Sequence, residues 1–524
     1  MAPDCRLALG VRPETPVDSR TCPGGAAVVG DRRLDSGESP SLSAAADGLL
    51  GRGGCSARRS TITLSPVPRG FLAGPLASFV PTLHDDDLTS TNQPAALLES
   101  DDLAGVRSPR VRSIAQVRLM ALPIPVPLRA MYYRYRWRKR RKEGRSIRIR
   151  VTDPAAFLRQ LEVAGVRSAV MRWWEEVPTT LEEAAVMPGD VDVLVDDAAA
   201  DAAARIASRM PGHAALEFRS VKGRFGALAS MPYYPPTFTE EVLAARVAHP
   251  RGFMIPAPQH RLPLVLFHLC YQKAERSGIP TGTDLPTGKA KRDYGAKLRA
   301  LAAEEGASLP EPLTLASIHE ELIRLDWDMQ LDALERWPLQ SPWIARLVRD
   351  ARGRYEPIAA KIPEVLVFIL RDDLTDDLRV RVRKQLDEWF DILDEGPLDA
   401  AQRHRCLRHL RGGNWMGDLG TKAVEPTHFI VCNDPTPAPV TDPVVRKKQP
   451  HVTNARARLK RVLRDDLREA AAAAGGRCRH GLHSSDNRYE TLHFLEVIFG
   501  DDLESRVARY AEQIVRLDGD RSAD

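Results

Sequence analysis

The pattern of apolar and polar positions separates a patternless beginning from three regions that contain regular elements. Residues 1 to about 110 are rich in Gly, Pro, Ser, Ala and Asp and show no sustained period of 2 or 3.6 residues. This predicts a disordered or low-complexity segment over 1–115. An alternative is that the native protein starts at Met120 or a nearby residue and that this stretch is not normally made.

The second region, residues 153–236, alternates helix and strand signals. Apolar positions at helical spacing are followed by short runs that alternate in the manner of half-buried strands. An alanine-rich stretch between the last two strands is a strong helix former. The predicted elements are a helix over 154–165, strands over 167–174, 190–197 and 213–221, and a helix over 198–210.

The third region, residues 237–360, is mostly helical, and proline clusters separate its helices. The fourth region, residues 361–524, has a mixed pattern. The order of its predicted elements is strand, helix, helix, strand, basic segment and helix. Its predicted elements are strands over 363–370 and 427–434, helices over 376–390 and 399–413, a helix over 454–473 whose first half could be a loop, and one or two helices over 491–515. The fold class predicted for the chain is α+β multidomain.

The composition restricts the kind of protein. The apolar fraction of 43% allows a substantial core, and a net charge of +5 over 524 residues does not by itself argue for nucleic acid. No run of about 18 apolar residues predicts a transmembrane segment, and the N-terminus lacks a secretory h-region. The seven cysteines are scattered and form no C-x-x-C pair, which argues against disulfides and zinc. A reducing cytoplasm is the simplest predicted location.

One short stretch interleaves basic and aromatic residues, MYYRYRWRKRRKEGRSIRIR over 131–150. Its basic part, 134–150, suits contact with an anionic surface, either lipid or nucleic acid. The simpler interpretation is a solvated basic linker whose aromatic residues pack on the next domain. We favour that interpretation from the sequence and assign 116–152 as a basic aromatic linker.

Paired acidic residues in the middle region suggest metal chemistry. Asp190 and Asp192 alternate along a predicted strand and therefore share one face. Two carboxylates so placed suit Mg²⁺, and Glu217 on the next predicted strand is the candidate third ligand. Residues 153–236 resemble the polymerase-β type of nucleotidyltransferase fold, followed by a helical domain over 237–360. The Gly-Ser of that family is missing from the corresponding stretch, VMRWWEEVP.

The segment from His480 to Asp486 reads His-Gly-Leu-His-Ser-Ser-Asp. It resembles the Asn-x-x-His-Gly-Ser-Asp signature of the nucleoside diphosphate kinase family, whose histidine is phosphorylated. His483 stands at the phosphorylated position, and Ser485 and Asp486 match the family's serine and aspartate. Ser484 replaces the family's glycine, and His480 replaces its asparagine.

Four further positions extend this resemblance over the C-terminal domain, 361–524. The family has a threonine followed eleven residues later by an arginine, and Thr453 and Arg464 have that spacing. Six residues before the threonine the family has a second arginine, where this chain has Lys447. The family's first strand ends in Lys-Pro-Asp, and Arg371 stands where the lysine would be.

The resemblance implies a ferredoxin-like αβ sandwich that transfers a phosphoryl group through a phosphohistidine, with Mg²⁺ as cofactor. The implied ligand is a nucleoside di- or triphosphate or another phosphorylated small molecule, and family members are commonly oligomers. An imidazole nucleophile needs cations and donors around the transferring oxygens. The candidates for this role are Arg371, Lys447, Thr453, Arg464, His480 and Ser485, and the imidazole could be oriented by Ser485, Glu490 or Glu496.

Three functions therefore follow from the sequence. The first is a nucleoside diphosphate kinase-like phosphotransferase with His483 as nucleophile. The second is a Mg²⁺-dependent nucleotidyltransferase that uses Asp190, Asp192 and Glu217. The third is a non-catalytic protein that keeps two nucleotide-handling folds for binding.

Overall fold

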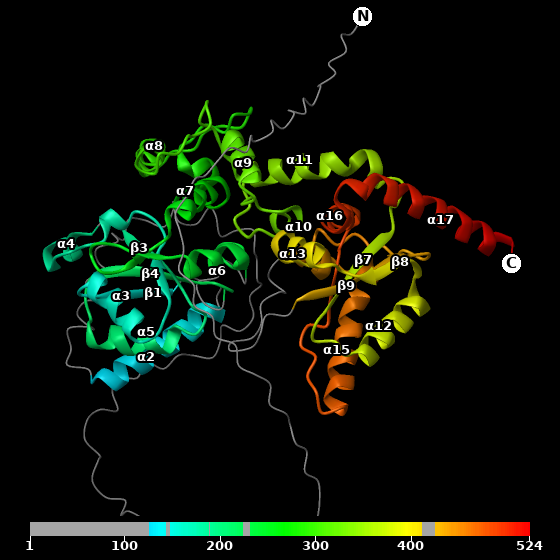
Figure 1. Cartoon of the computed structure of the whole chain (residues 1–524), viewed down its shortest axis with the longest axis horizontal. Helices are drawn as coiled ribbons and strands as arrows, with labels where there is room; N and C mark the ends of the chain where they lie inside the picture. The colour runs from blue at the N-terminus through cyan, green and yellow to red at the C-terminus, as the bar shows by residue number, and fades with distance from the viewer. Residues whose placement is uncertain (1–124, 143–146, 188, 224–230, 411–424, 524) are drawn as a thin grey trace, which may run out of the picture. The chain divides into compact units, whose positions relative to one another are not determined.

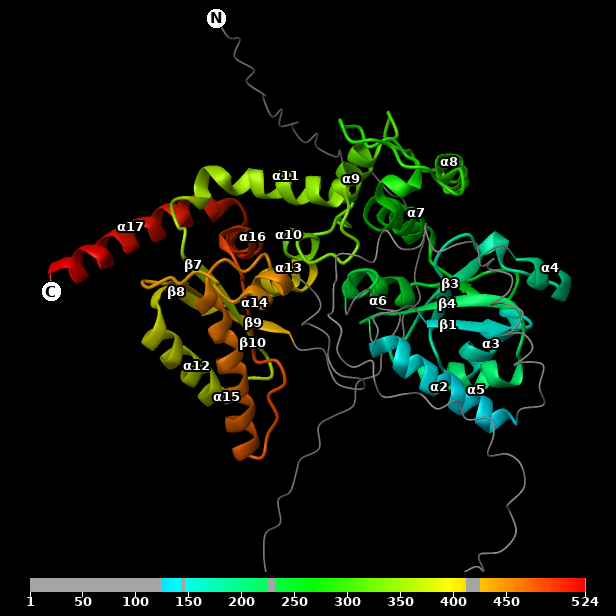
Figure 2. The same ribbon diagram turned by 180° about the vertical axis from the view of Figure 1, so that it is seen from behind.

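The fold is described from a computed structural model of the whole chain (Figures 1 and 2). The structure describes residues 125–142, 147–187, 189–223, 231–410 and 425–523. The predicted disordered segment, 1–115, lies outside these residues. The described part mixes helices and strands throughout, which confirms the α+β class at that level.

The first sheet contains four strands in the order β1-β4-β3-β2. Strands β3 and β4 run parallel and are connected by helix α5 (Ala200–Arg209), whereas β1 and β2 run antiparallel to their neighbours. The predicted alternation places β3 and β4 correctly. The strands are β1 (Ile147–Val151), β2 (Ser168–Val170), β3 (Asp190–Val195) and β4 (Ala214–Ser220).

Three helices pack against one face of this sheet: α2 (Val126–Lys142), α3 (Pro154–Val163) and α5 (Figure 1). Helix α3 begins where the Asp153 side chain accepts the Ala156 N–H, and Phe157 packs its ring 5.9 Å from that of Phe218 on β4. The stretch assigned from the sequence as a linker thus contains a helix and strand β1. Helix α4 (Leu181–Val186) lies between β2 and β3.

The region after β4 is helical, as its pattern predicts. Prolines stand in the first turn of several of its helices, where a missing N–H costs nothing. One turn is a π-helix, η2 (His268–Lys273), which continues directly from α7. The other elements of this region are α6 (Pro236–Ala244), β5 (Val247–Ala248), β6 (Met254–Ile255), α7 (Pro258–Phe267), η3 (Ala274–Ser277), α8 (Tyr294–Glu304), α9 (Leu315–Arg324), α10 (Leu331–Leu334) and α11 (Pro342–Ala359), whereas η1 (Trp174–Glu176) lies earlier, between β2 and α4.

The second sheet contains four antiparallel strands in the order β10-β7-β9-β8. Helices α12 (Asp376–Trp389) and α15 (Leu459–Ala473) cover one face, and α13 (Ala400–His409) and α16 (Arg488–Phe499) cover the other (Figure 2). The strands are β7 (Val365–Arg371), β8 (Asp391–Pro397), β9 (Pro426–Asn433) and β10 (Leu482–Ser484), and α14 (Pro443–Lys448), η5 (Ala455–Arg458), η6 (Gly500–Asp502) and α17 (Leu503–Ala523) complete the region.

Strand β8 was not predicted from the sequence. Its sequence, DILDEGP, contains three acidic residues and a glycine, so it lacks the apolar alternation of a typical strand. The reason is its position at the edge of the sheet, where one side of the strand faces no neighbour and charged side chains are tolerated.

Two findings concern membrane-spanning helices and cysteines. Among the described helices, none is both long enough and apolar enough to cross a bilayer. The four cysteines within the described residues, Cys270, Cys406, Cys432 and Cys478, are buried and carry free thiols.

Candidate functional site

One face of the first sheet carries charged side chains on three neighbouring strands. Asp190 and Asp192 share a face of β3, as their spacing predicts, and Glu217 on β4 lies directly opposite Asp192 in the register. Arg148 on β1 lies opposite Glu217 on the other side of β4. The three predicted metal ligands therefore lie on one face, which we call the charged face. It is the face opposite to Phe218 and helix α3.

The carboxylates on the charged face repel each other. The pKa of Asp190 is raised from 3.8 to about 6, chiefly by burial, then by a hydrogen bond with Glu217 and by the charges of Asp192 and Glu217. Arg148 works in the opposite direction, since its Nη2 lies 3.1 Å from Asp190 Oδ2. Burial and the neighbouring carboxylates therefore oppose the charged form of Asp190 despite its contact with Arg148.

Two buried arginines contact the other two carboxylates. Arg172, just after β2, places Nη2 2.7 Å from Asp192 Oδ2, and Arg219 places Nη2 2.9 Å from Glu217 Oε1. Tyr233 connects them: its hydroxyl accepts a hydrogen bond from Arg172 at 3.3 Å, and its ring centroid lies 4.0 Å below the Arg219 guanidinium. Cations and carboxylates thus alternate across the charged face.

The π-helix η2 adds further polar groups beside Tyr233. His268 Nδ1 lies 2.6 Å from Gln272 Oε1 and 3.2 Å from the Tyr233 hydroxyl. Burial and the neighbouring Arg172 hold the pKa of His268 well below its usual value. Lys273 ends the π-helix, and its pKa is lowered by burial and by Arg172. The site therefore keeps a neutral imidazole and a partly desolvated ammonium next to the carboxylates.

Two residues next to this site have backbone conformations that are rare for residues with side chains. Trp173 has φ +54° and Ala274 has φ +49°. Each directly follows a cation of the site, Arg172 and Lys273 respectively. Such conformations and π-helical turns are costly and gather at functional sites. They support treating the charged face as a site rather than as a solvated strand end.

Sequence reasoning found the acids of this site but not its cations or tyrosine. Arg148, Arg172, Arg219, Tyr233 and Lys273 were not predicted. The sequence contained a signal for two of them. Arg219 stands two residues after Glu217 on β4 and Arg148 two residues before Arg150 on β1, so the members of each pair share a strand face. The other three come from loops and a helix end, whose positions no local pattern reveals.

Carboxylate oxygens have the right chemistry for Mg²⁺, and a bound cation would favour the charged form of Asp190, which burial and then the neighbouring carboxylates disfavour. The residues fit a cation in that sense. Arg172 and Arg219 meet two of the three carboxylates, and the part of the chain that is described contains no ready-made cage of three or more His, Cys, Asp or Glu side chains. A divalent ion would therefore bind with displacement of the arginine contacts.

The C-terminal candidates lie in a different environment. His483 is on β10 opposite Ile369, is fully buried, and has its ring centroid 5.6 Å from that of Phe494 on α16. Arg371 and Arg464 approach the same strand: Arg371 is buried and its backbone N–H donates to Gly481, while Arg464 Nε donates to the Leu482 carbonyl at 2.9 Å. Arg371 on β7 and Arg464 on α15 thus contact the backbone at or next to β10, which carries His483.

The remaining C-terminal candidates are divided between the interior and the surface. The Ser485 hydroxyl is buried, accepts the Val367 N–H at 3.0 Å and lies 2.9 Å from the Thr491 hydroxyl. His480 is half-buried, and its backbone N–H donates to Asp373 at 3.0 Å. Lys447 and Thr453 are exposed and line a surface hollow formed by residues 439–453.

The two carboxylates that could orient the His483 imidazole, Glu490 and Glu496, form hydrogen bonds with other groups. Glu490 accepts the backbone N–H of Asp486 at 2.8 Å, and Glu496 accepts a hydrogen bond from the Tyr355 hydroxyl. Asp486, which matches the family's aspartate, pairs with Arg336 and Lys460, and His451 Nε2 lies 3.7 Å from it. These contacts hold the loop after β10 in place.

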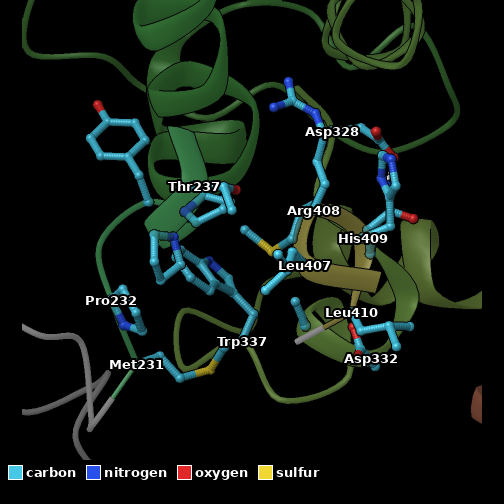
Figure 3. A pocket seen from close by; sticks show the side chains of 16 residues that line it. Met231, Pro232, Thr237, Asp328, Asp332, Trp337, Leu407, Arg408, His409 and Leu410 are labelled. Atoms are coloured by element: carbon cyan, nitrogen blue, oxygen red, sulfur yellow. Dashed lines mark hydrogen bonds between the residues drawn. The ribbon is translucent and has the colours of Figure 1, made fainter. Parts of the chain in front are cut away.

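A small, mostly apolar pocket lies where the loop before α6, the turn at α10 and the end of α13 meet (Figure 3). Pro232, Trp337 and Leu410 line it, and Asp328 stands at its edge with a pKa raised to about 6 by burial. The Arg408 guanidinium is held by Glu241 at 2.7 Å and by Asp326. The pocket therefore offers apolar surface rather than reactive groups.

Known proteins do not identify this chain. Comparisons with protein-family models, with curated proteins and with solved structures found no match. The charged face and the environment of His483 are therefore the features that indicate a function.

Proposed function

We propose that this protein binds a nucleoside triphosphate with Mg²⁺ on the charged face and transfers its nucleotidyl group to an acceptor. The observation that carries the proposal is the grouping of Asp190, Asp192 and Glu217 on one sheet face, where burial and then the carboxylate neighbours raise the pKa of Asp190 to about 6. Three carboxylates that share one face suit a divalent cation. The adjacent β2-β3-α5-β4 connectivity supports the resemblance to a polymerase-β-type fold.

In this proposal the three carboxylates would hold Mg²⁺, which when bound offsets phosphate charge and polarises the phosphorus that is attacked. The cations have the complementary role. Arg172 stands in the stretch where the related fold carries Gly-Ser, so a guanidinium would replace backbone N–H donors as the phosphate contact. Arg219 and Lys273 extend the cationic surface beside it. In this proposal, phosphate groups of the ligand would replace the carboxylates as partners of the two arginines.

Thermal unfolding with each nucleoside triphosphate, with and without Mg²⁺, tests this function. A ligand at about a hundred times its Kd stabilises the folded state by about 2.7 kcal/mol. We expect this gain for the wild type in Mg²⁺, and release of pyrophosphate when the acceptor is present. We expect the Mg²⁺-dependent gain to disappear in Asp192→Asn and to persist in Asp201→Asn, a change at an exposed aspartate on α5. Equal gains in both variants, or no gain with any nucleotide, would contradict the proposal.

A second candidate function is phosphoryl transfer through His483. Two observations favour it: the β10-β7-β9-β8 order suits a ferredoxin-like sandwich, and Arg464 contacts β10 while the backbone of Arg371 contacts the residue just before it. The reaction requires the imidazole to become accessible, because His483 is fully buried against Phe494. Movement of helix α16 would be the step that exposes it.

Incubation with γ-labelled ATP tests this second function. A phosphohistidine is labile in acid, so we expect acid-labile label on the wild type and none on His483→Ala. His428→Ala is the matched control, since His428 is a partly exposed histidine on β9 of the same sheet. An unlabelled wild type, or equal label on the wild type and His483→Ala, would eliminate this function.

A further inference from the structure

Helix α2 exposes an unusual amount of apolar surface. Five of the twelve large apolar side chains that are exposed in the described residues belong to this 17-residue helix. Leu128, Met131 and Tyr135 are 56%, 60% and 66% exposed. Spacings of three and four residues place them in one stripe along the helix. Isolated exposed apolar residues are ordinary, but a continuous stripe marks a surface that meets a partner.

The opposite side of α2 fixes the helix on the domain. Ala130, Tyr133 and Trp137 are buried at spacings of three and four residues, and the Tyr133 hydroxyl donates to the Arg150 carbonyl. Arg134 pairs with Asp201 on α5 at 2.8 Å. The apolar stripe is therefore presented outward by a packed helix.

The exposed side of α2 continues from apolar to basic. Arg138 and Lys139 are exposed one turn beyond Tyr135, and Arg136 donates to the Tyr132 hydroxyl at 3.1 Å. The helix sequence contains no Asp or Glu. The outward surface thus combines apolar side chains with positive charge, and that charge is complementary to anionic lipids.

We propose that α2 docks this protein on the surface of a bilayer that contains anionic lipids. The stripe of Leu128, Met131 and Tyr135 would enter the headgroup region, and Arg138 and Lys139 would contact lipid phosphates and carboxylates. Lipid fits better than single-stranded nucleic acid, which offers base faces for aromatic stacking but no partner for aliphatic leucine and methionine. The attachment that we propose is peripheral, with α2 lying at the bilayer surface.

This docking is separate from the proposed nucleotide chemistry. Helices α2, α3 and α5 pack on one face of the first sheet, and the charged face is the other. A protein bound through α2 would therefore keep Asp190, Asp192 and Glu217 turned away from the lipid. Failure of nucleotide binding would leave the docking unaffected, and the reverse also holds.

Co-sedimentation of the full chain with vesicles tests the docking. We expect binding to vesicles of equimolar phosphatidylcholine and phosphatidylserine, and little binding to phosphatidylcholine alone. Each basic residue near an anionic surface strengthens binding about fivefold, so Arg138→Gln with Lys139→Gln should weaken it roughly thirtyfold. Leu128→Glu with Met131→Glu should weaken it by about tenfold or more, since two inserted apolar side chains are lost.

The matched control carries the same chemical change on other helices. Ile323 on α9 and Val515 on α17 are 52% and 71% exposed, so Ile323→Glu with Val515→Glu should bind vesicles like the wild type. An absence of vesicle binding by the wild type would overturn the proposal, as would equal binding by all three double variants. Fluorescence anisotropy with a single-stranded RNA provides the alternative: binding of RNA but not of vesicles would replace lipid with nucleic acid.

Discussion

Both sheets of this protein carry charged groups at their predicted sites, but the surroundings of these groups differ between the two sheets. On the first sheet, the carboxylates repel one another and Arg148 beside them is half-exposed. On the second, His483, Arg371 and Ser485 are fully buried, and Ser485 has hydrogen-bond partners within the protein. A carboxylate whose pKa is shifted beside other titratable groups is a candidate for a ligand site, whereas buried polar groups with internal partners ordinarily stabilise the fold.

Asp486 and Asp190 make the comparison concrete. Asp486 is buried, and its charge is compensated by Arg336 and Lys460, with His451 3.7 Å away. Asp190 faces one half-exposed arginine and two other carboxylates. The same side chain therefore stabilises the folded state in one place and destabilises it in the other. Substitution at each position can test that contrast.

The largest expected effect is the loss of Asp486. Removal of one partner from a buried ion pair leaves the others uncompensated and costs about 3–5 kcal/mol. We expect Asp486→Ala to lower the free energy of unfolding by that amount in urea denaturation. Asp465→Ala is the control, because Asp465 is an exposed residue paired with Arg468 on the same helix and should change stability by less than about 0.5 kcal/mol. Similar costs for the two variants would show that the buried network is not structural.

The sequence could predict only those parts of the two sites that a local pattern of residues specifies. The period of 2 in DVDVLVDD places Asp190 and Asp192 on one face, and the structure agrees. Arg172 and Tyr233 could not be found in the same way, because 61 residues separate them and a loop brings them together. Local patterns reveal which side chains share a strand face but not which loops cross that face.

Two other differences have local physical causes. The spacing of Ala130, Tyr133 and Trp137 is helical, yet the density of charge favoured interpretation as a linker. His483 is buried against Phe494. This phenylalanine lies on helix α16, outside the motif of residues 480–486. A signature such as His-Ser-Ser-Asp gives the reactive side chain but contains no information about what covers it.

The smaller expected effect is a gain in stability from Asp190→Asn. The pKa of Asp190 in the folded protein, about 6, lies above its ordinary value of 3.8. The folded state therefore binds this proton more tightly than the unfolded state, and stability is lost as pH rises from about 4 to about 6. Asparagine cannot ionise and avoids that loss. Allowing for partial solvent exposure of the carboxyl, we expect Asp190→Asn to be more stable than the wild type by about 1–2 kcal/mol at pH 8, with a smaller difference at pH 5.

Urea denaturation at both pH values, with and without Mg²⁺, measures this effect. Mg²⁺ should narrow the difference at pH 8, because only the wild type offers the cation all three carboxylates. Asp201→Asn, at an exposed aspartate of the same domain, should show no such dependence on pH. If Asp190→Asn were less stable than the wild type at pH 8, or if the difference did not change with pH, the carboxylates would already be compensated within the protein. The charged face would then resemble the second sheet, and the contrast between the two regions would disappear.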